Sequence, residues 1–166
     1  MLFRSEWPTV MGNIHISAGR EKEATEAFER AFNTETSEET LLRAVNSHIL
    51  RKEPDWNGAV SLLRANPKVV AESIPLQASL GSALVNAKQR DAGLQALRNT
   101  YNSVRDAVDR KVARADMWDL WYASVAQAFQ NRPQDAEAFV KAVLGGRVRS
   151  EEHTSELQSP CNLVCR

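Results

Sequence analysis

The residues of this 166-residue chain that could do chemistry are few and scattered. His15 and His48 lack a second histidine three or four positions away, which a zinc-binding helix would supply. The run Ser79–Ser82 lacks the flanking glycines of the turn that exposes a nucleophilic serine, and no strand precedes it. The pair Gly145–Gly146 lacks the strand, loop and helix order of a phosphate-binding loop. We therefore expect no enzymatic activity, no metal and no cofactor.

The charged residues are balanced, with 21 Lys and Arg against 21 Asp and Glu. Between Arg105 and Asp116 basic and acidic residues alternate, which is typical of a solvated, salt-bridged face rather than a nucleic-acid-binding patch. No run of eighteen apolar residues exists, so the sequence predicts no membrane span. We expect a protein or peptide partner and no nucleic acid.

Apolar residues recur at steps of three and four along most of the chain, which predicts amphipathic helices. Seven glycines and six prolines are too few for the many turns of an all-β sandwich. The predicted helical faces lie within residues 9–17, 24–32, 41–50, 59–63, 76–87, 94–108, 121–129 and 136–143. The fold class predicted from this pattern is all-α, with about eight helical segments joined by short turns.

Helix boundaries are predicted from capping residues. Thr36–Glu39 has the spacing of a capping box, and Asp55 and Asp91 are placed to cap the helices that follow them. Pro133 fits the first turn of the last helix, where its missing N–H costs nothing. Gly145 is suited to the left-handed conformation that ends a helix. The helix near Asp91 is expected to be long and to end near residue 112.

A pattern of small and bulky residues repeats along the chain. The small residues are Ala24, Ala59, Gly93 and Ala136, and the bulky residues four positions later are Phe28, Leu63, Leu97 and Val140. In the preceding helix of each pair, the contact position holds Gly12, Asn46, Gly81 or Ser124. Because glycine has no Cβ, Gly12 and Gly81 predict close approach of the partner helix, and Phe28, Leu63 and Leu97 are expected to fill the gap between neighbouring units.

This pattern resembles the tetratricopeptide repeat family, whose unit of about thirty-four residues is a pair of antiparallel helices. The resemblance covers nearly all of residues 6–148 and implies a right-handed helical-repeat solenoid of about four pairs. One pair cannot bury its own apolar face, so neighbouring pairs would supply the core by stacking. Exposed ends of such a stack predict self-association of the chain.

The resemblance also implies a function as an interaction scaffold, because arrays of this family hold partner proteins on a concave surface. In this register the surface would present Asn13, Ser17, Arg43, Ser47, Ser82, Asn86, Trp118 and Trp121. For the two tryptophans, packing in the core is the alternative that we favour, since helical-repeat cores regularly bury aromatic side chains. Two other functions stay open: a regulatory region of an enzyme whose catalytic domain lies elsewhere, and a structural spacer in a cell-envelope protein.

Both ends of the chain differ from the helical part. The run Arg149–Ser159 resembles the translation of a sequencing-library adapter, and Leu2–Ser5 resembles the translated end of its partner. We therefore expect residues 1–5 and 149–166 to be non-native, the latter disordered, and residues 6–148 to be a piece of a longer protein. Cys161 and Cys165 both lie in this tail, so we assign them no disulfide or metal site.

Overall fold

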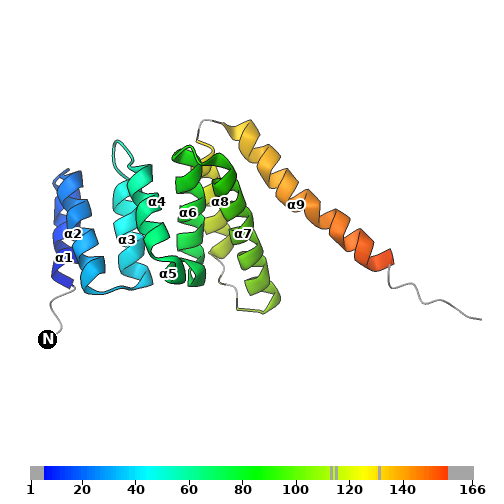
Figure 1. Cartoon of the computed structure of the whole chain (residues 1–166), viewed down its shortest axis with the longest axis horizontal. Helices are drawn as coiled ribbons and strands as arrows, with labels where there is room; N and C mark the ends of the chain where they lie inside the picture. The colour runs from blue at the N-terminus through cyan, green and yellow to red at the C-terminus, as the bar shows by residue number, and fades with distance from the viewer. Residues whose placement is uncertain (1–5, 113, 115, 131, 157–166) are drawn as a thin grey trace, which may run out of the picture. The chain divides into compact units, whose positions relative to one another are not determined.

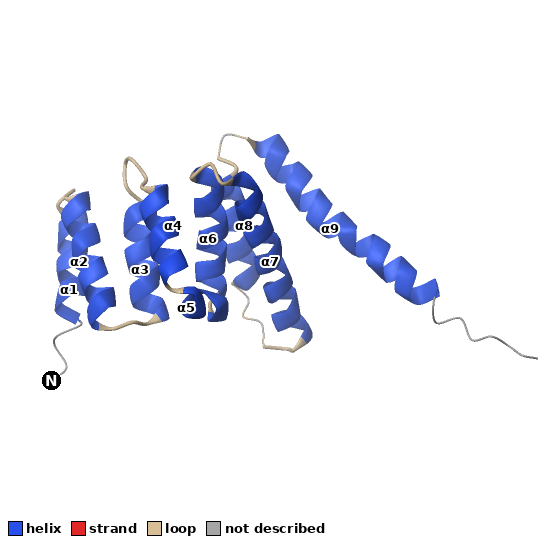
Figure 2. Cartoon of the chain, in the orientation of Figure 1, coloured by secondary structure: helices blue, strands red, loops and turns tan. Residues whose placement is uncertain are grey.

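A computed structural model describes residues 6–112, 114, 116–130 and 132–156, with side chains described up to Gly145. Every regular element among these residues is helical, which confirms the predicted all-α class (Figure 2). In chain order the helices are α1 (Glu6–Ser17), α2 (Glu21–Thr34), α3 (Glu38–Ile49), α4 (Trp56–Ala65), α5 (Pro67–Glu72), α6 (Ile74–Asn86), α7 (Arg90–Asp109), α8 (Met117–Ala128) and α9 (Pro133–Glu156). Of the end segments that we expect to be non-native, residues 1–5 and 157–166 lie outside the described residues.

The chain divides into two compact units, one ending at Ala128 with α1–α8 and one beginning at Phe129 with α9. Within the first unit each helix contacts the next in the chain, and short turns make consecutive long helices antiparallel (Figure 1). Contacts between α3 and α6 and between α6 and α8 join helices that are not consecutive. The first unit is therefore built from helical hairpins in contact with their neighbours.

Glycines allow the paired helices to approach closely, as the sequence predicts. A Cβ on Gly12 would lie 2.6 Å from the ring of Phe28, so α1 and α2 meet where this glycine has no side chain. A Cβ on Gly81 would lie 2.7 Å from the side chain of Leu97, and this contact joins α6 to α7 in the same way. Both contacts lie between adjoining helices of a hairpin, at equivalent positions of the repeat.

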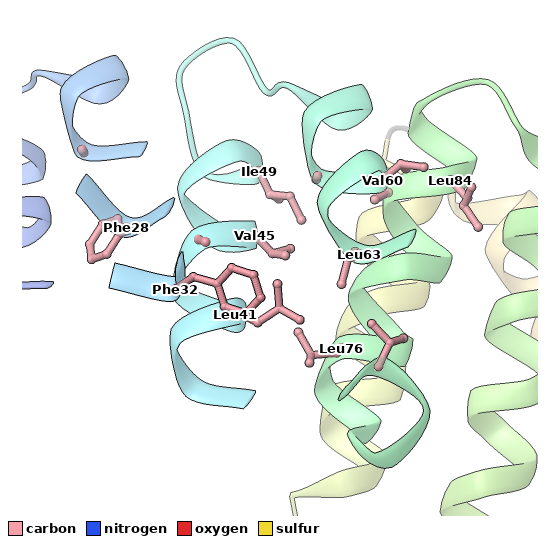
Figure 3. Close-up of a cluster of buried hydrophobic side chains, with 14 residues drawn as sticks. Phe28, Phe32, Leu41, Val45, Ile49, Val60, Leu63, Leu76 and Leu84 are labelled. Carbon is pink, nitrogen blue, oxygen red and sulfur yellow. The ribbon is translucent and has the colours of Figure 1, made fainter. Parts of the chain in front are cut away.

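Buried apolar side chains fill the spaces between α2, α3, α4, α5 and α6. Figure 3 shows Phe32 of α2 near Leu41 of α3. It also shows Leu63 on the side of α4 that faces Leu76 of α6. Leu41 and Leu76 are fully buried. Burying side chains of this size stabilises the fold by about 1.5–3 kcal/mol each relative to exposure.

Two of the predicted N-caps are wrong by one position or more. The capping box of α3 is formed by Ser37 and Thr40, because the Ser37 hydroxyl accepts from the Thr40 N–H at 3.2 Å, whereas the Thr36 hydroxyl donates to a backbone carbonyl. Asp91 lies inside the first turn of α7, which begins at Arg90. The Asp91 carboxylate therefore does not cap α7, but it still interacts favourably with the dipole at the start of the helix. Asp55 caps α4 as predicted, accepting from the Gly58 N–H at 2.8 Å.

The C-terminal ends of three helices share one geometry. Gly19, Lys88 and Lys111 each have a positive φ, between 58° and 69°, just after α1, α6 and α7. At each end two backbone N–H groups bond back to the last turn, as in a Schellman motif. This motif ends α7 at Asp109, three residues before the predicted limit near residue 112.

The last two differences concern α5 and α9. α5, which begins at Pro67, was not among the predicted helices, because six residues are too few to show a helical period. Pro133 begins α9 as predicted. The predicted stop at Gly145 is wrong: α9 continues to Glu156, because no proline lies between Gly145 and Glu156 and glycine inside a helix costs only about 1 kcal/mol.

Candidate functional site: a groove beside the first three helices

An open groove lies where α1, α2 and α3 meet. Its lining consists of Asn13, Ile16, Gly19, Glu21, Ala24, Phe28, Arg43, Asn46, Ser47, Leu50 and Arg51. Three of the residues predicted to face a partner, Asn13, Arg43 and Ser47, are therefore brought together here. The other five predicted residues do not line this groove.

The helices position the lining by their period. Arg43, Ser47 and Leu50 follow one another at steps of four and three on α3 and just beyond it, so they share one face. Asn13 and Ile16 stand one turn apart on α1. Gly19, with its positive φ of 69°, turns the chain from α1 into α2. Side chains from two hairpins thus converge on one surface.

Two guanidinium groups and one carboxylate set the charge of the groove. Arg43 pairs with Glu39 at 2.8 Å, and both side chains remain solvent-exposed. Arg51 donates to the Ser47 carbonyl at 3.1 Å and to the Thr25 hydroxyl, which fixes it between α2 and α3. Glu21 accepts from the backbone N–H of Lys52 at 3.0 Å. The lining therefore carries a local excess of positive charge.

Apolar side chains form the base and the rim of the groove. Ala24 and Phe28 are buried beneath it. Ile16 and Leu50 are exposed to 55% and 75%, although their side chains are large and apolar. An apolar surface beside amide and guanidinium donors suits a ligand that offers both side chains and carbonyl or carboxylate oxygens. None of the lining residues is paired with a base in the manner of a nucleophile.

The remaining polar residues of the predicted set serve contacts within the fold. The Ser17 hydroxyl donates to the Asn13 carbonyl at 3.0 Å, and Ser17 itself is exposed. Ser82 is fully buried and donates to the side chain of Gln127 at 2.9 Å. Asn86 donates to the Gln127 carbonyl at 3.1 Å. Ser82 and Asn86 therefore join α6 to α8 instead of facing an open surface.

The two tryptophans belong to an aromatic cluster that joins α7 to α8. Trp121 is fully buried, and its indole N–H donates to the Leu97 carbonyl at 2.9 Å. Its ring lies 5.2 Å from that of Tyr101 and 6.4 Å from that of Trp118. Trp118 is half-buried and lies 5.4 Å from Tyr101. The burial of Trp121 agrees with packing in the core, the alternative that we favour for it from the sequence.

Sequence reasoning missed several residues of the groove, notably Ile16, Asn46, Leu50 and Arg51. Asn46 stood in the repeat register as a helix-contact position, so its second role on the surface was hidden. Arg51 lies one turn after Ser47, and that spacing is the one signal that could have included it. Its contact with Thr25 spans 26 positions of sequence, which no local pattern reveals.

A polar cluster lies on another side of the α2–α3 contact. The ring nitrogens of the buried His48 lie 2.8 Å from a Glu29 oxygen and 3.0 Å from an Asp55 oxygen. The Gly58 N–H bond, opposed by partial burial and reinforced by His48, holds the pKa of Asp55 below its ordinary value of 3.8.

The Nδ1 atom of His15 is buried without a hydrogen-bond partner among the described residues. In that same part of the chain, no group of three His, Cys, Asp or Glu residues is arranged to hold a metal.

Within the described residues, none of the helices combines the length and the apolar character that crossing a bilayer requires. No protein-family model, curated protein or solved structure matches the chain.

Proposed function

We propose that the chain is a tetratricopeptide-like helical-repeat scaffold that binds an extended segment of a partner protein in the groove beside α1, α2 and α3. The proposal includes the right-handed solenoid, whose hairpins would be α1–α2, α3–α4 with the short α5, and α6–α7, with α8 beginning the next. The groove is its binding surface, and Asn13, Arg43 and Ser47 are its predicted contact residues.

The repeat supports this architecture. Gly12 and Phe28 of the first hairpin stand 69 positions before Gly81 and Leu97, and both pairs make the same close helix contact. The helix-ending Gly19 and Lys88 are also 69 positions apart. Equivalent residues in equivalent contacts are what a stack of similar units requires.

One observation carries the functional part: polar donors and large exposed apolar side chains from two different hairpins line a single open groove. Ile16 and Leu50 expose apolar surface that the fold itself leaves uncovered. The guanidinium of Arg43 is available beside them, because its pair with Glu39 is exposed and such pairs contribute only about 0–1 kcal/mol. A peptide segment could satisfy both features, with its side chains on the rim and its oxygens on the donors.

The test is a selection of random peptides displayed on phage against the full chain, followed by fluorescence anisotropy with the selected synthetic peptides. The variants Arg43→Glu and Leu50→Asp should raise the peptide Kd about tenfold or more, because each removes a contact and adds an opposing group. Both side chains are exposed, so the variants should fold as the wild type does.

Arg30→Glu is the matched control, since Arg30 is an exposed arginine of α2 that does not line the groove. Its peptide Kd should stay within about twofold of the wild type. Selected peptides whose affinity is the same for wild type, Arg43→Glu and Leu50→Asp would contradict the groove as the binding surface.

A further inference from the structure

One face of α1 exposes large apolar side chains. Trp7, Val10 and Ile14 are exposed to 65%, 44% and 46%. They are spaced at steps of three and four, so they form one stripe along the helix, which Ala18 extends just beyond its end. Gly12 lies on the opposite side, where α1 packs against Phe28 of α2. The stripe is therefore the side of α1 that its own hairpin does not cover.

The equivalent positions of α3 and α6 are covered. Counted in the register of Gly12, Asn46 and Gly81, Trp7 corresponds to Leu41 and Leu76, both of which are fully buried.

Ile14 corresponds in that register to His48 and Ala83, which are also buried. α2 covers α3 along this face, as the contacts of His48 with Glu29 and of Arg51 with Thr25 show. α4 contacts α6. The sequence of α1 thus has the apolar pattern of a helix that receives another helix.

A shallow hollow lies on the stripe, lined by Val10, Asn13, Ile14, Ser17 and Ala18. The first four stand at positions i, i+3, i+4 and i+7, the arrangement of four residues that receives one knob of a facing helix in knobs-into-holes packing. Trp7 stands one turn before this hollow on the same stripe.

Trp7 is therefore a large knob, and it lies beside a hole of the kind that a facing helix would fill. One helix cannot insert its own knob into its own hole, but two antiparallel copies can each fill the hole of the other.

The places of Trp7 and of the hollow along α1 set the direction of the pair. In an antiparallel pair, Trp7 of each copy can lie level with Ile14 of the other, whereas two parallel helices in one register cannot seat both tryptophans. Two-fold pairing of this kind uses the same surface patch on both copies and closes on itself.

We propose that two copies of this chain form an antiparallel dimer through α1, with Trp7 of each copy seated in the hollow around Ile14 of the other. Trp7 and Ile14 do not line the groove, whereas Asn13 lines both the hollow and the groove, so substitutions at Trp7 and Ile14 test the dimer without changing the groove lining.

The test is sedimentation velocity of the full chain over a concentration series. The wild type should shift from the 18.5 kDa monomer to twice that mass. Trp7→Arg and Ile14→Arg should each raise the dimer Kd about thirtyfold, the loss typical of a residue that dominates an interface. Both side chains are exposed, so circular dichroism should stay unchanged, and the thermal midpoint should equal that of the wild type at a concentration where the wild type is monomeric.

Val112→Arg is the matched control, because Val112 is an apolar residue exposed to 62% beyond the end of α7. Its dimer Kd should equal that of the wild type. A wild type that stays monomeric at about 1 mM would overturn the proposal, as would equal weakening by Val112→Arg. Growth beyond the dimer with concentration would overturn the two-fold closure.

Discussion

The α2–α3 and α7–α8 contacts hold neighbouring helices by different means. Between α2 and α3, His48 bonds Glu29 and Arg51 bonds Thr25, so polar side chains join the helices. Between α7 and α8, the rings of Tyr101 and Trp121 pack at 5.2 Å.

The two contacts still share a plan. In the repeat register Tyr101 corresponds to Phe32, which packs near Leu41 at the other end of the α2–α3 contact. One aromatic anchor is therefore common to both, and the remaining positions differ.

The difference teaches how the repeat tolerates divergence. Polar bonds fix the register of two helices because they are directional, but each contributes only about 0.5–1.5 kcal/mol net. Buried aromatic rings contribute more through the area they remove from water. We therefore expect the α7–α8 contact to depend on one large residue and the α2–α3 contact to depend on several small contributions.

The largest effect is expected for Trp121→Ala. This change removes a fully buried ring and its hydrogen bond to the Leu97 carbonyl, so it should lower the free energy of unfolding by about 3–5 kcal/mol. Urea denaturation followed by circular dichroism measures the loss. Tyr122→Ala is the control, since Tyr122 is half-exposed and contacts the same ring from outside, and it should cost about 1 kcal/mol. Equal costs for the two variants would contradict the aromatic anchor.

Gly58→Ala should have the next largest effect. A Cβ on Gly58 would overlap the Asp55 carboxylate and lie 2.6 Å from Nδ1 of His48, so the polar cluster must shift. We expect a loss of about 1–3 kcal/mol in the same denaturation experiment.

Gly145→Ala is the matched control for this change. A Cβ on Gly145 meets no atom within 4 Å, and alanine favours the helix by about 1 kcal/mol. A Gly58→Ala variant as stable as the wild type would show that the cluster does not hold the α2–α3 contact.

A smaller effect is expected for the cap of α4. Asp55→Ala removes the acceptor of the Gly58 N–H and the partner of His48, and it should cost about 1 kcal/mol. Asp55→Asn keeps an oxygen for the cap but not the charge beside His48, so its loss should be less than that of Asp55→Ala. Thermal denaturation of the pair separates the two contributions, and identical midpoints would show that only the charge matters.

The smallest effect is the pH dependence of the same residue. The folded-state pKa of Asp55 is lowered by the Gly58 N–H bond and by His48, so its contribution to stability is present above pH 3.8. That contribution is lost as the pH falls below 3.8 through the lower folded value. The drop in thermal midpoint between pH 5 and pH 2.5 should therefore be smaller in Asp55→Asn than in the wild type. An unchanged drop would contradict the assignment.

Much of the fold could be predicted because apolar residues recur every three or four positions in the sequence of an amphipathic helix. The close contacts of Gly12 and Gly81 followed from the repeat. The cap of α3 was misplaced because Thr36 and Ser37 are adjacent and both can accept a backbone N–H. α5 showed no period over its six residues.

The groove could be predicted only in part. Asn13, Arg43 and Ser47 came from the repeat register, which identifies the helix face but not the depth of burial. Trp121 shares that face with surface positions, and only its contacts with Leu97 and Tyr101 place it in the core. Burial depends on which helices lie opposite, and a single sequence does not specify the distance between them.

The position of α6 has a consequence for how the first unit opens. α6 contacts α3, α4, α5, α7 and α8, and its Gly81 and the facing Gly93 bring its backbone against that of α7. A helix enclosed on so many sides can release its amide protons to solvent only when several neighbours separate at once. At concentrations where the chain is monomeric, deuterium uptake should therefore be slowest in α6 among α1–α8, and fastest in α1, which can fray without disturbing the rest.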